Sequence, residues 1–390
     1  MKKLTKLASV VLAAAMVMSS LTACGGSNAG SANADATTFK IGGIGPITGG
    51  AAVYGQAVMN GAQIAIDEIN AAGGINGYQV EFNPQDDEHD AEKSVNAYNT
   101  LKDWGMQHLL GTVTSAPCIA VEAEAVNDNM FLLTPSGTAV ECISGDNACR
   151  VCFADPTQGT ESAKYIAANE LATKVAVIYD SSDPYSAGIY NAFQIEAANQ
   201  DVFEIVAAEA FTSDNKTDFS VQIQKAKDAG ADMVYMPFYY NEAALVLKQA
   251  KDMGYEPKWF GGDGMDGILD LEGFDTTLAE GLMYFTPFSA AAEDEKTQNF
   301  VAAFKEMTGG IPNQFGADAY DGIYIMKMAM EKAGVTPDMD ASEICDLMKV
   351  AMQEITFDGI TGSQITWDAA GEPVKAPLAV VINNGVAEFM

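Results

Sequence analysis

Two loops rich in hydroxyl groups are the segments of this sequence best suited to bind a ligand. Residues 112–117 read Thr-Val-Thr-Ser-Ala-Pro and residues 134–138 read Thr-Pro-Ser-Gly-Thr, each directly after an apolar run. Both place hydroxyl and free backbone N–H groups at the expected start of a helix, where a carboxylate binds well. Ser115 and Thr138 could also be ordinary helix caps. Two such loops at neighbouring strand ends favour an anion site without excluding caps.

Three other segments carry residues typical of cofactor or metal sites, and none of them completes its pattern. Residues 41–46 are glycine-rich, but Thr48 stands where a dinucleotide-binding loop needs a glycine. Residues 86–90, Asp-Asp-Glu-His-Asp, lack the glycine and the final glutamate of a calcium loop, which favours a polar turn. Residues 261–266 fit a single unit of a calcium-binding repeat that works only when stacked. We expect no metal and no cofactor.

Catalytic groups are scarce in this chain. It contains only two histidines, His89 and His108, and no GxSxG nucleophile elbow. His108 begins an apolar run and is expected at the start of a buried strand. A hydrolase triad therefore has few candidates. We name no catalytic residue and expect a protein that is not an enzyme.

The elements that must position these loops alternate along the chain. Strand patterns fall at 39–44, 78–83, 108–111, 131–134, 174–179, 202–209, 233–236, 259–261 and 283–285. Helical patterns fall at 51–72, 91–104, 117–127, 185–199, 218–229, 242–253, 294–307, 315–333 and 342–352. Such alternation gives parallel sheets covered by helices on both faces. Two such series predict an α/β fold of two doubly wound lobes.

Ligands of open parallel sheets bind outside the carboxyl ends of the strands. That rule directs attention to the loops after Ile44, Gly111, Leu133 and Phe260. The tail from residue 365 to residue 390 is expected to add strands, with a hairpin turn at Asn-Asn-Gly 383–385.

The N-terminus has the features of a secretory signal. Three lysines among the first six residues precede an apolar stretch over 7–17, and small residues then lead to Cys24. The apolar stretch is too short for a membrane-spanning helix. Small residues before a cysteine resemble the bacterial lipobox, which predicts a signal peptide over 1–23 and lipid chains on Cys24. Residues 24–38 are rich in Gly, Ser, Asn and Ala and are expected to form a flexible tether.

The charge and the cysteines limit the possible partners and cross-links. A formal net charge of -32 disfavours nucleic acid and anionic headgroups as partners. Besides Cys24 there are five cysteines, at positions 118, 142, 149, 152 and 345. An exported protein can form disulfides. A Cys142–Cys149 bond would close a short loop, and Cys118 or Cys152 are alternative partners, so the connectivity stays open.

From residue 39 to its end, the chain resembles the leucine/isoleucine/valine-binding family of ABC-transporter substrate-binding proteins. The segments that carry the resemblance are 45–49 (Gly-Pro-Ile-Thr-Gly), 69–75 (Ile-Asn-Ala-Ala-Gly-Gly-Ile), 111–115, 134–138, 155–159 and 319–321. The resemblance implies a type I periplasmic-binding-protein fold, in which two lobes joined by a three-strand hinge close like a clamshell on an amino acid. It divides the chain into an N-terminal lobe of 39–155 plus 288–362 and a C-terminal lobe of 156–287 plus 363–390.

The resemblance also assigns roles in ligand binding. The ligand carboxylate would meet Ser115, Gly137 and Thr138 of the first lobe, and the ammonium would meet Asp263 of the second. Tyr239 would contact the ligand from the second lobe, with Tyr240 as the alternate if the register slips by one. Tyr54 and Phe315 would wall the side-chain pocket.

Two positions depart from the family pattern. The family prototype has Glu where this chain has Asp263, and Gly137 replaces a more usual Ala. Both changes reshape the pocket, so they leave amino-acid binding expected and the choice among amino acids open. A zwitterion needs donors for its carboxylate and an anion for its ammonium, and placing these on opposite lobes makes closure depend on the ligand.

We therefore expect an extracytoplasmic, membrane-anchored lipoprotein that captures a branched-chain or similar amino acid and delivers it to an ABC transporter permease. A sensory ligand-binding module for amino acids or amides is the alternative, because related two-lobed folds serve receptors. An enzyme that uses Asp263 and a serine is a third possibility.

Overall fold

The computed structural model describes residues 37–390. The predicted signal peptide, Cys24 and nearly all of the tether lie outside the described residues. Within the described range no helix is both long enough and apolar enough to cross a membrane. The folded part begins at Thr38, close to the predicted start at residue 39.

The first sheet is parallel and has the strand order β2-β1-β3-β4-β5. Its strands are β1 (Thr38–Gly45), β2 (Gln79–Asp86), β3 (His108–Gly111), β4 (Phe131–Thr134) and β5 (Ala148–Arg150). Strands β3 and β4 are buried along their whole length, as expected for strands covered on both faces. His108 begins β3 and is fully buried, which confirms that prediction.

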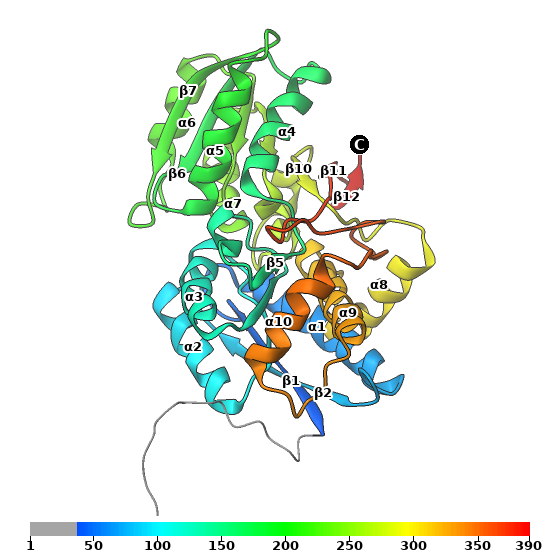
Figure 1. Cartoon of the computed structure of the whole chain (residues 1–390). Helices are drawn as coiled ribbons and strands as arrows, with labels where there is room; N and C mark the ends of the chain where they lie inside the picture. The colour runs from blue at the N-terminus through cyan, green and yellow to red at the C-terminus, as the bar shows by residue number, and fades with distance from the viewer. Residues whose placement is uncertain (1–36) are drawn as a thin grey trace, which may run out of the picture. The chain divides into compact units, whose positions relative to one another are not determined.

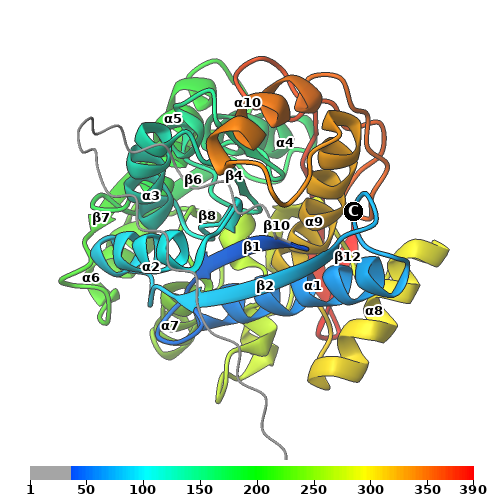
Figure 2. The ribbon, with the colours of Figure 1, turned by 60° about the horizontal axis from the view of Figure 1, so that its bottom comes forward.

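The helices of this half are α1 (Ala52–Ala71), α2 (Ala91–Trp104), α3 (Ser115–Asp128), α8 (Glu295–Thr308), α9 (Gln314–Ala333) and α10 (Ala341–Met352). Figure 2 shows β1 and β2 side by side, with α1 and α9 next to each other. The two helices approach closely because Gly61 of α1 faces Gly316 of α9. A Cβ atom on Gly61 would lie 2.1 Å from the Gly316 carbonyl oxygen.

The second sheet, within residues 37–390, has the order β12-β11-β10-β9-β8-β6-β7. Its strands are β6 (Lys174–Asp180), β7 (Glu204–Phe211), β8 (Met233–Met236), β9 (Lys258–Gly261), β10 (Met283–Thr286), β11 (Leu378–Asn383) and β12 (Val386–Phe389). Strand β11 is antiparallel to β10 and to β12, and the predicted hairpin turn joins β11 to β12. The other pairs are parallel.

The helices of this second half are α4 (Asp155–Ala168), α5 (Pro184–Ala197), α6 (Ser220–Asp228) and α7 (Tyr240–Asp252). Short 3-10 turns complete the fold at Val140–Ile143 (η1), Asp263–Met265 (η2), Ile268–Asp270 (η3) and Thr276–Ala279 (η4). Figure 1 shows the helices that pack on both sheets. The prediction of two α/β halves with parallel sheets is confirmed.

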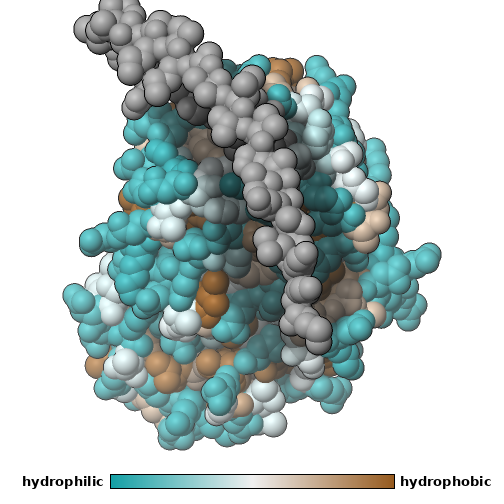
Figure 3. Space-filling view, turned by 90° about the horizontal axis from the view of Figure 1, so that it is seen from below, coloured by the Kyte–Doolittle hydropathy of each residue, from teal (hydrophilic) through white to brown (hydrophobic). Residues whose placement is uncertain are grey.

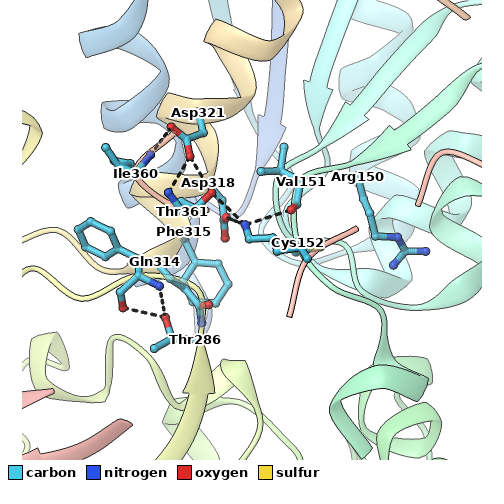
Figure 4. Close-up of polar contacts among 12 residues, drawn as sticks. Arg150, Val151, Cys152, Thr286, Gln314, Phe315, Asp318, Asp321, Ile360 and Thr361 are labelled. Atoms are coloured by element: carbon cyan, nitrogen blue, oxygen red, sulfur yellow. Dashed lines mark hydrogen bonds and ion pairs between the residues drawn. The ribbon is translucent and has the colours of Figure 1, made fainter. Parts of the chain in front are cut away.

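The chain passes between the two sheets three times, after β5, after β10 and after α10. The predicted lobe boundaries at 155/156, 287/288 and 362/363 fall at or near these connections, and the division itself stays a prediction. Lys375 ties two of the connections to α9, because its Nζ donates to the Val151 carbonyl (3.2 Å), to Asp318 Oδ1 (3.0 Å) and to Thr361 Oγ1 (2.9 Å). Figure 4 shows Val151, Asp318 and Thr361 gathered around this point, with Asp321 accepting from Thr361.

The structure contains two elements that the sequence patterns did not indicate, β5 and α4. Strand β5 has only three residues, too few for a periodic pattern. Helix α4 begins at Asp155-Pro156 and contains little apolar periodicity that a sequence window can detect. A proline at the second helical position was the available signal for its start.

Where it is not covered by grey atoms, the face in Figure 3 is mostly hydrophilic, with hydrophobic side chains scattered over it. This surface agrees with the large excess of acidic residues.

Candidate functional site

The two hydroxyl-rich loops lie side by side and are bonded to each other. Ser136 Oγ donates to the Val113 carbonyl at 2.7 Å, and Ser115 Oγ accepts from the Ala139 N–H at 3.2 Å. Thr134 Oγ1 donates to the Thr112 carbonyl at 2.7 Å. Parallel pairing of β3 with β4 brings the two strand ends to the same edge, so the loops meet there.

The two loops lead into different elements. Helix α3 begins at Ser115, two residues before the expected start at residue 117, so Ser115 is not its cap. The capping position belongs to Thr114, whose side chain makes no cap bond. The expectation that Thr138 also stands at the start of an α-helix is wrong. The segment after it forms only the 3-10 turn η1, in which Cys142 packs with Ala139 against Cys118 of α3.

The packing around Gly137 explains why the chain has glycine here in place of the alanine that is more usual in the family. A Cβ atom at this position would lie 2.8 Å from Thr134 Oγ1 and 2.9 Å from Cys118 Sγ. Its carbonyl oxygen accepts from Arg150 Nη1 at 3.0 Å. Glycine therefore fits this position, because neighbouring side chains already fill the space that a Cβ atom would need.

Asp263 lies on the other side of the site, in η2 directly after β9. It is buried, its Oδ1 accepts from the Tyr185 hydroxyl at 2.7 Å, and its N–H donates to Gln158 Oε1 at 2.9 Å. Burial raises the pKa of this carboxyl to about 6, although hydrogen bonds from Tyr185 and Gln158 oppose the shift.

A second buried carboxylate, Asp155, stands near the first. Among residues 37–390 neither of its oxygens has a hydrogen-bond partner, and the side chain is 1% exposed. Burial raises its pKa well above the usual range, the nearby Thr138 side chain opposes the shift, and the charge of Asp263 adds to it. Its N–H donates to the Thr138 carbonyl at 2.9 Å, which holds it against the hydroxyl loop. The family resemblance placed Asp155 at a lobe crossover but gave it no role in the site.

Aromatic rings wall the space between these groups. The rings of Tyr54 and Phe315 lie 4.2 Å apart between centroids, and Tyr239 stacks on Tyr185 at 4.8 Å. Tyr239, not Tyr240, faces this space; Tyr240 packs on the edge of Tyr54 and its hydroxyl accepts from the Val53 N–H.

These groups enclose a narrow cavity of only about 10 Å³. The lining includes every residue that the sequence singled out for ligand binding except Gly137, which supports the loop from behind. Tyr185, which lines the cavity, and Asp155 beside it were missed, because no local pattern marks either residue. The full lining is Tyr54, Val113, Thr114, Ser115, Ser136, Thr138, Tyr185, Tyr239, Asp263, Gly264 and Phe315.

Direct hydrogen bonds join the two halves across this cavity. Tyr54 of α1 donates its hydroxyl proton to the Gly264 carbonyl and accepts from the Tyr240 N–H at 3.2 Å. Gln314 of α9 donates from Nε2 to the Asp263 carbonyl at 2.7 Å and from its backbone N–H to Asp266 Oδ2 at 2.8 Å. The cavity is narrow and hydrogen bonds join the two halves across it, so this is a closed arrangement. The two halves must separate before a ligand can enter.

Residues 38–385 match the family model described as periplasmic binding protein. The chain belongs to the periplasmic binding protein family. This places it among extracytoplasmic proteins that bind a solute and confirms the family resemblance.

The relatives of this periplasmic binding protein agree with that assignment. The Leu/Ile/Val-binding protein BraC3 of Rhizobium johnstonii is 32% identical over 80% of this chain and 83% of its own length. The leucine-, isoleucine-, valine-, threonine-, and alanine-binding protein of Pseudomonas aeruginosa is 30% identical over 86% of this chain and 87% of its own.

A solved structure extends the likeness to the fold of the periplasmic binding protein. The branched-chain amino acid transporter substrate-binding protein LivJ of Streptococcus pneumoniae, in complex with isoleucine, superposes with a TM-score of 0.81 at 30% identity, over 90% of this chain and 99% of its own. A benzoate-bound solute-binding protein from R. palustris, at 19% identity and a TM-score of 0.78, shares the fold alone; it covers 90% of this chain and 95% of its own.

Proposed function

We propose that this periplasmic binding protein captures a free amino acid, branched-chain or similar, for uptake through an ABC transporter. One observation carries the proposal: the cavity has hydroxyl loops on one side and the buried carboxylate of Asp263 on the other. A zwitterion carries opposite charges at a short, fixed spacing. This cavity offers hydrogen-bond donors for the negative end from one half of the protein and a carboxylate for the positive end from the other.

The ligand carboxylate binds the Ser115 hydroxyl and the backbone and hydroxyl of Thr138, with Gly137 shaping the loop. The N-terminus of α3 adds its positive end, which favours an anion at Ser115. The ammonium binds Asp263, and Asp155 supplies a second carboxylate whose oxygens have no partner among the described residues. An uncompensated buried carboxylate is costly, so a cation close to these two groups stabilises both.

Aromatic rings contact the ligand side chain. Tyr54, Phe315 and Tyr239 all line the cavity, and the Tyr54 ring contacts both of the others. Such rings bury apolar surface but carry no charge that would select a charged side chain. Relatives named for binding leucine, isoleucine and valine support the same class of ligand.

The protein binds its ligand without changing it and hands it to a membrane permease. Incubation with an amino-acid mixture followed by release and mass analysis should return the bound amino acid unaltered. Recovery of a converted product would support an enzyme in place of a carrier.

Isothermal calorimetry on the purified chain tests the proposal. Wild-type protein should bind at least one of leucine, isoleucine and valine, and Asp263→Ala should lose most of the affinity, because the buried ammonium is left unpaired. Asp270→Ala is the matched control, since Asp270 lies in the neighbouring turn η3, is exposed and does not line the cavity. Equal affinity for the wild type and Asp263→Ala would remove Asp263 from the site.

We also propose a lipid anchor on Cys24. The small residues before Cys24 support it. Lipid chains would hold the protein at the membrane without a spanning helix. Cys24→Ala should move the protein from the membrane fraction to the soluble fraction, whereas retention at the membrane would contradict the anchor.

A further inference from the structure

We infer that Cys118 and Cys142 form a disulfide bond in the exported protein, directly behind the two hydroxyl loops of the ligand site. Cys118 lies in the first turn of α3 and Cys142 lies in η1, and both are fully buried. The structure holds both as thiols in contact range of the same loop. The inference concerns the protein's covalent structure and does not depend on which ligand the site binds.

The contacts of the two side chains place their sulfur atoms together. Cys118 Sγ lies 3.9 Å from the Cys142 carbonyl oxygen, and Cys142 Sγ lies 3.7 Å from the Ser115 carbonyl oxygen. A Cβ atom built on Gly137 would lie 2.9 Å from one sulfur and 3.1 Å from the other, so the two sulfurs flank a single point. With Ala139 they form a small apolar cluster of their own.

The pair is also chemically unequal. A hydrogen bond with Cys142 lowers the pKa of the Cys118 thiol, while burial raises the pKa of Cys142. Cys118 also sits at a helix N-terminus, where a thiolate is favoured. In the folded chain Cys118 is therefore the more acidic thiol of the two.

Thiol–disulfide exchange with a small external disulfide accounts for every atom and electron. The Cys118 thiolate attacks one sulfur of the external disulfide, which breaks and releases one thiol. Cys142 then gives up its proton and attacks the Cys118 sulfur, which releases the second thiol. Two protein thiols are oxidised and one external disulfide is reduced. Extracytoplasmic compartments supply such disulfides. Because both sulfurs are buried in the folded protein, the bond forms while the chain folds.

Cys149 and Cys345 have other neighbours, whereas Cys152 contacts the backbone of the same loop. Cys149 of β5 lies near Cys345 of α10, which contributes to the raised pKa of Cys149. Cys152 donates to the Gly137 carbonyl at 3.7 Å. The short Cys142–Cys149 loop considered from the sequence is therefore not the pairing that these contacts favour.

Peptide mapping of the full chain, exported by a bacterial host, tests the bond. The protein is denatured and alkylated without reductant, then cut after Asp and Glu. Cys118 then falls in peptide 104–122 and Cys142 in 142–146, while Cys149 and Cys152 fall together in 147–161, because Pro156 blocks cleavage after Asp155. A linked pair of 104–122 and 142–146 that separates on reduction is expected. Alkylated Cys118 and Cys142, or a link to 147–161, would overturn the inference.

Thermal melting with and without a phosphine reductant gives a second readout. Reductant should lower the melting temperature of the wild type by several degrees, because the bond restrains the unfolded chain. Cys345→Ser should respond like the wild type, whereas Cys118→Ala and Cys142→Ala should not respond. A wild type insensitive to reductant would contradict the bond, and neither experiment uses a ligand.

Discussion

At the scale of single residues, the candidate site contains two buried carboxyl groups whose pKa values are raised. Burial raises the pKa of Asp263 to about 6, and it raises the pKa of nearby Asp155 well above its usual range. Burial disfavours their ionised forms, so binding of the ligand ammonium at this place, as proposed, would be linked to proton release. The net charge of the protein does not determine these pKa values. The local burial of the two carboxyl groups does.

The first prediction is that affinity for the amino acid falls with pH below about 6. The ammonium favours ionised Asp263, so the pKa of this carboxyl is lower in the complex than in the free protein. Below the pKa of the free protein, binding must therefore release a proton from Asp263. Titration of Asp263 alone should lower the affinity about tenfold between pH 7 and pH 5. Calorimetry across pH 5–8 checks this, and an affinity that is flat over the range would contradict it. Asp155 titrates beside the same cavity, so Asp155→Asn should be measured with the wild type.

The second prediction concerns Gly137. Gly137→Ala places a methyl group less than 3 Å from Thr134 Oγ1 and Cys118 Sγ. We expect a loss of about 1–3 kcal/mol in unfolding free energy from overpacking, together with weaker ligand binding as the loop shifts. Denaturant unfolding measures the first effect. Gly310→Ala is the control, because its nearest atom is Thr308 Oγ1 at 3.6 Å, and it should leave stability nearly unchanged.

At the scale of elements, packing between α1 and α9 builds one wall of the cavity. The close crossing at Gly61 and Gly316 brings Tyr54 and Phe315 together, and Tyr54 then reaches the other half of the protein through Gly264 and Tyr240. One tyrosine thus has both roles, since its ring shapes the pocket and its hydroxyl holds the halves together.

The third prediction separates these two roles. Tyr54→Phe keeps the ring and removes both hydrogen bonds across the cavity, each of which contributes about 1 kcal/mol. Affinity should fall about tenfold, mainly through faster dissociation, because the closed arrangement is less favoured. Surface plasmon resonance or stopped-flow measurement resolves the rates. Tyr324→Phe also loses a hydroxyl bond, to Glu68 outside the cavity, and should bind as the wild type does.

At the scale of the whole molecule, a buried ion pair ties the connections between the sheets to α9. Lys375 and Asp318 are 3.0 Å apart, with side chains 3% and 2% exposed. Lys375 also bonds the Val151 carbonyl of the first connection and Thr361 of the third, while Asp318 lies one helical turn after Phe315. Two of the three connections between the sheets are thereby held against the helix that carries Phe315 of the cavity wall.

The fourth prediction follows from this pair. Lys375→Met leaves Asp318 without its buried partner and should cost about 3–5 kcal/mol of unfolding free energy. Adding Asp318→Asn should recover part of that loss, because the second change removes the unpaired charge. A double-mutant cycle from denaturant unfolding measures the coupling, and additive losses would refute it. Lys251→Met, at the exposed pair with Glu256, should change stability little.

Much of the fold could be predicted from local patterns. Alternating apolar runs and amphipathic segments indicated the parallel strands, and Asn-Gly at 384–385 indicated the C-terminal hairpin. The hydroxyl loops around Ser115 and Thr138 were found as residue types at strand ends. Asp263, Tyr239, Tyr54 and Phe315 came only from the family resemblance, because an isolated Asp, Tyr or Phe carries no local signal of a binding role.

Neighbouring residues along the chain were enough to establish the order and type of most elements, the acidic character of the protein and the position of the hydroxyl-rich loops. Tertiary packing alone established that Asp155 lies beside Asp263, that η1 replaces a helix after Thr138, and that Cys118 meets Cys142. Each of these depends on segments far apart in the chain being packed together, and the burial that results changes the pKa values and the available partners of side chains whose types were visible from the start.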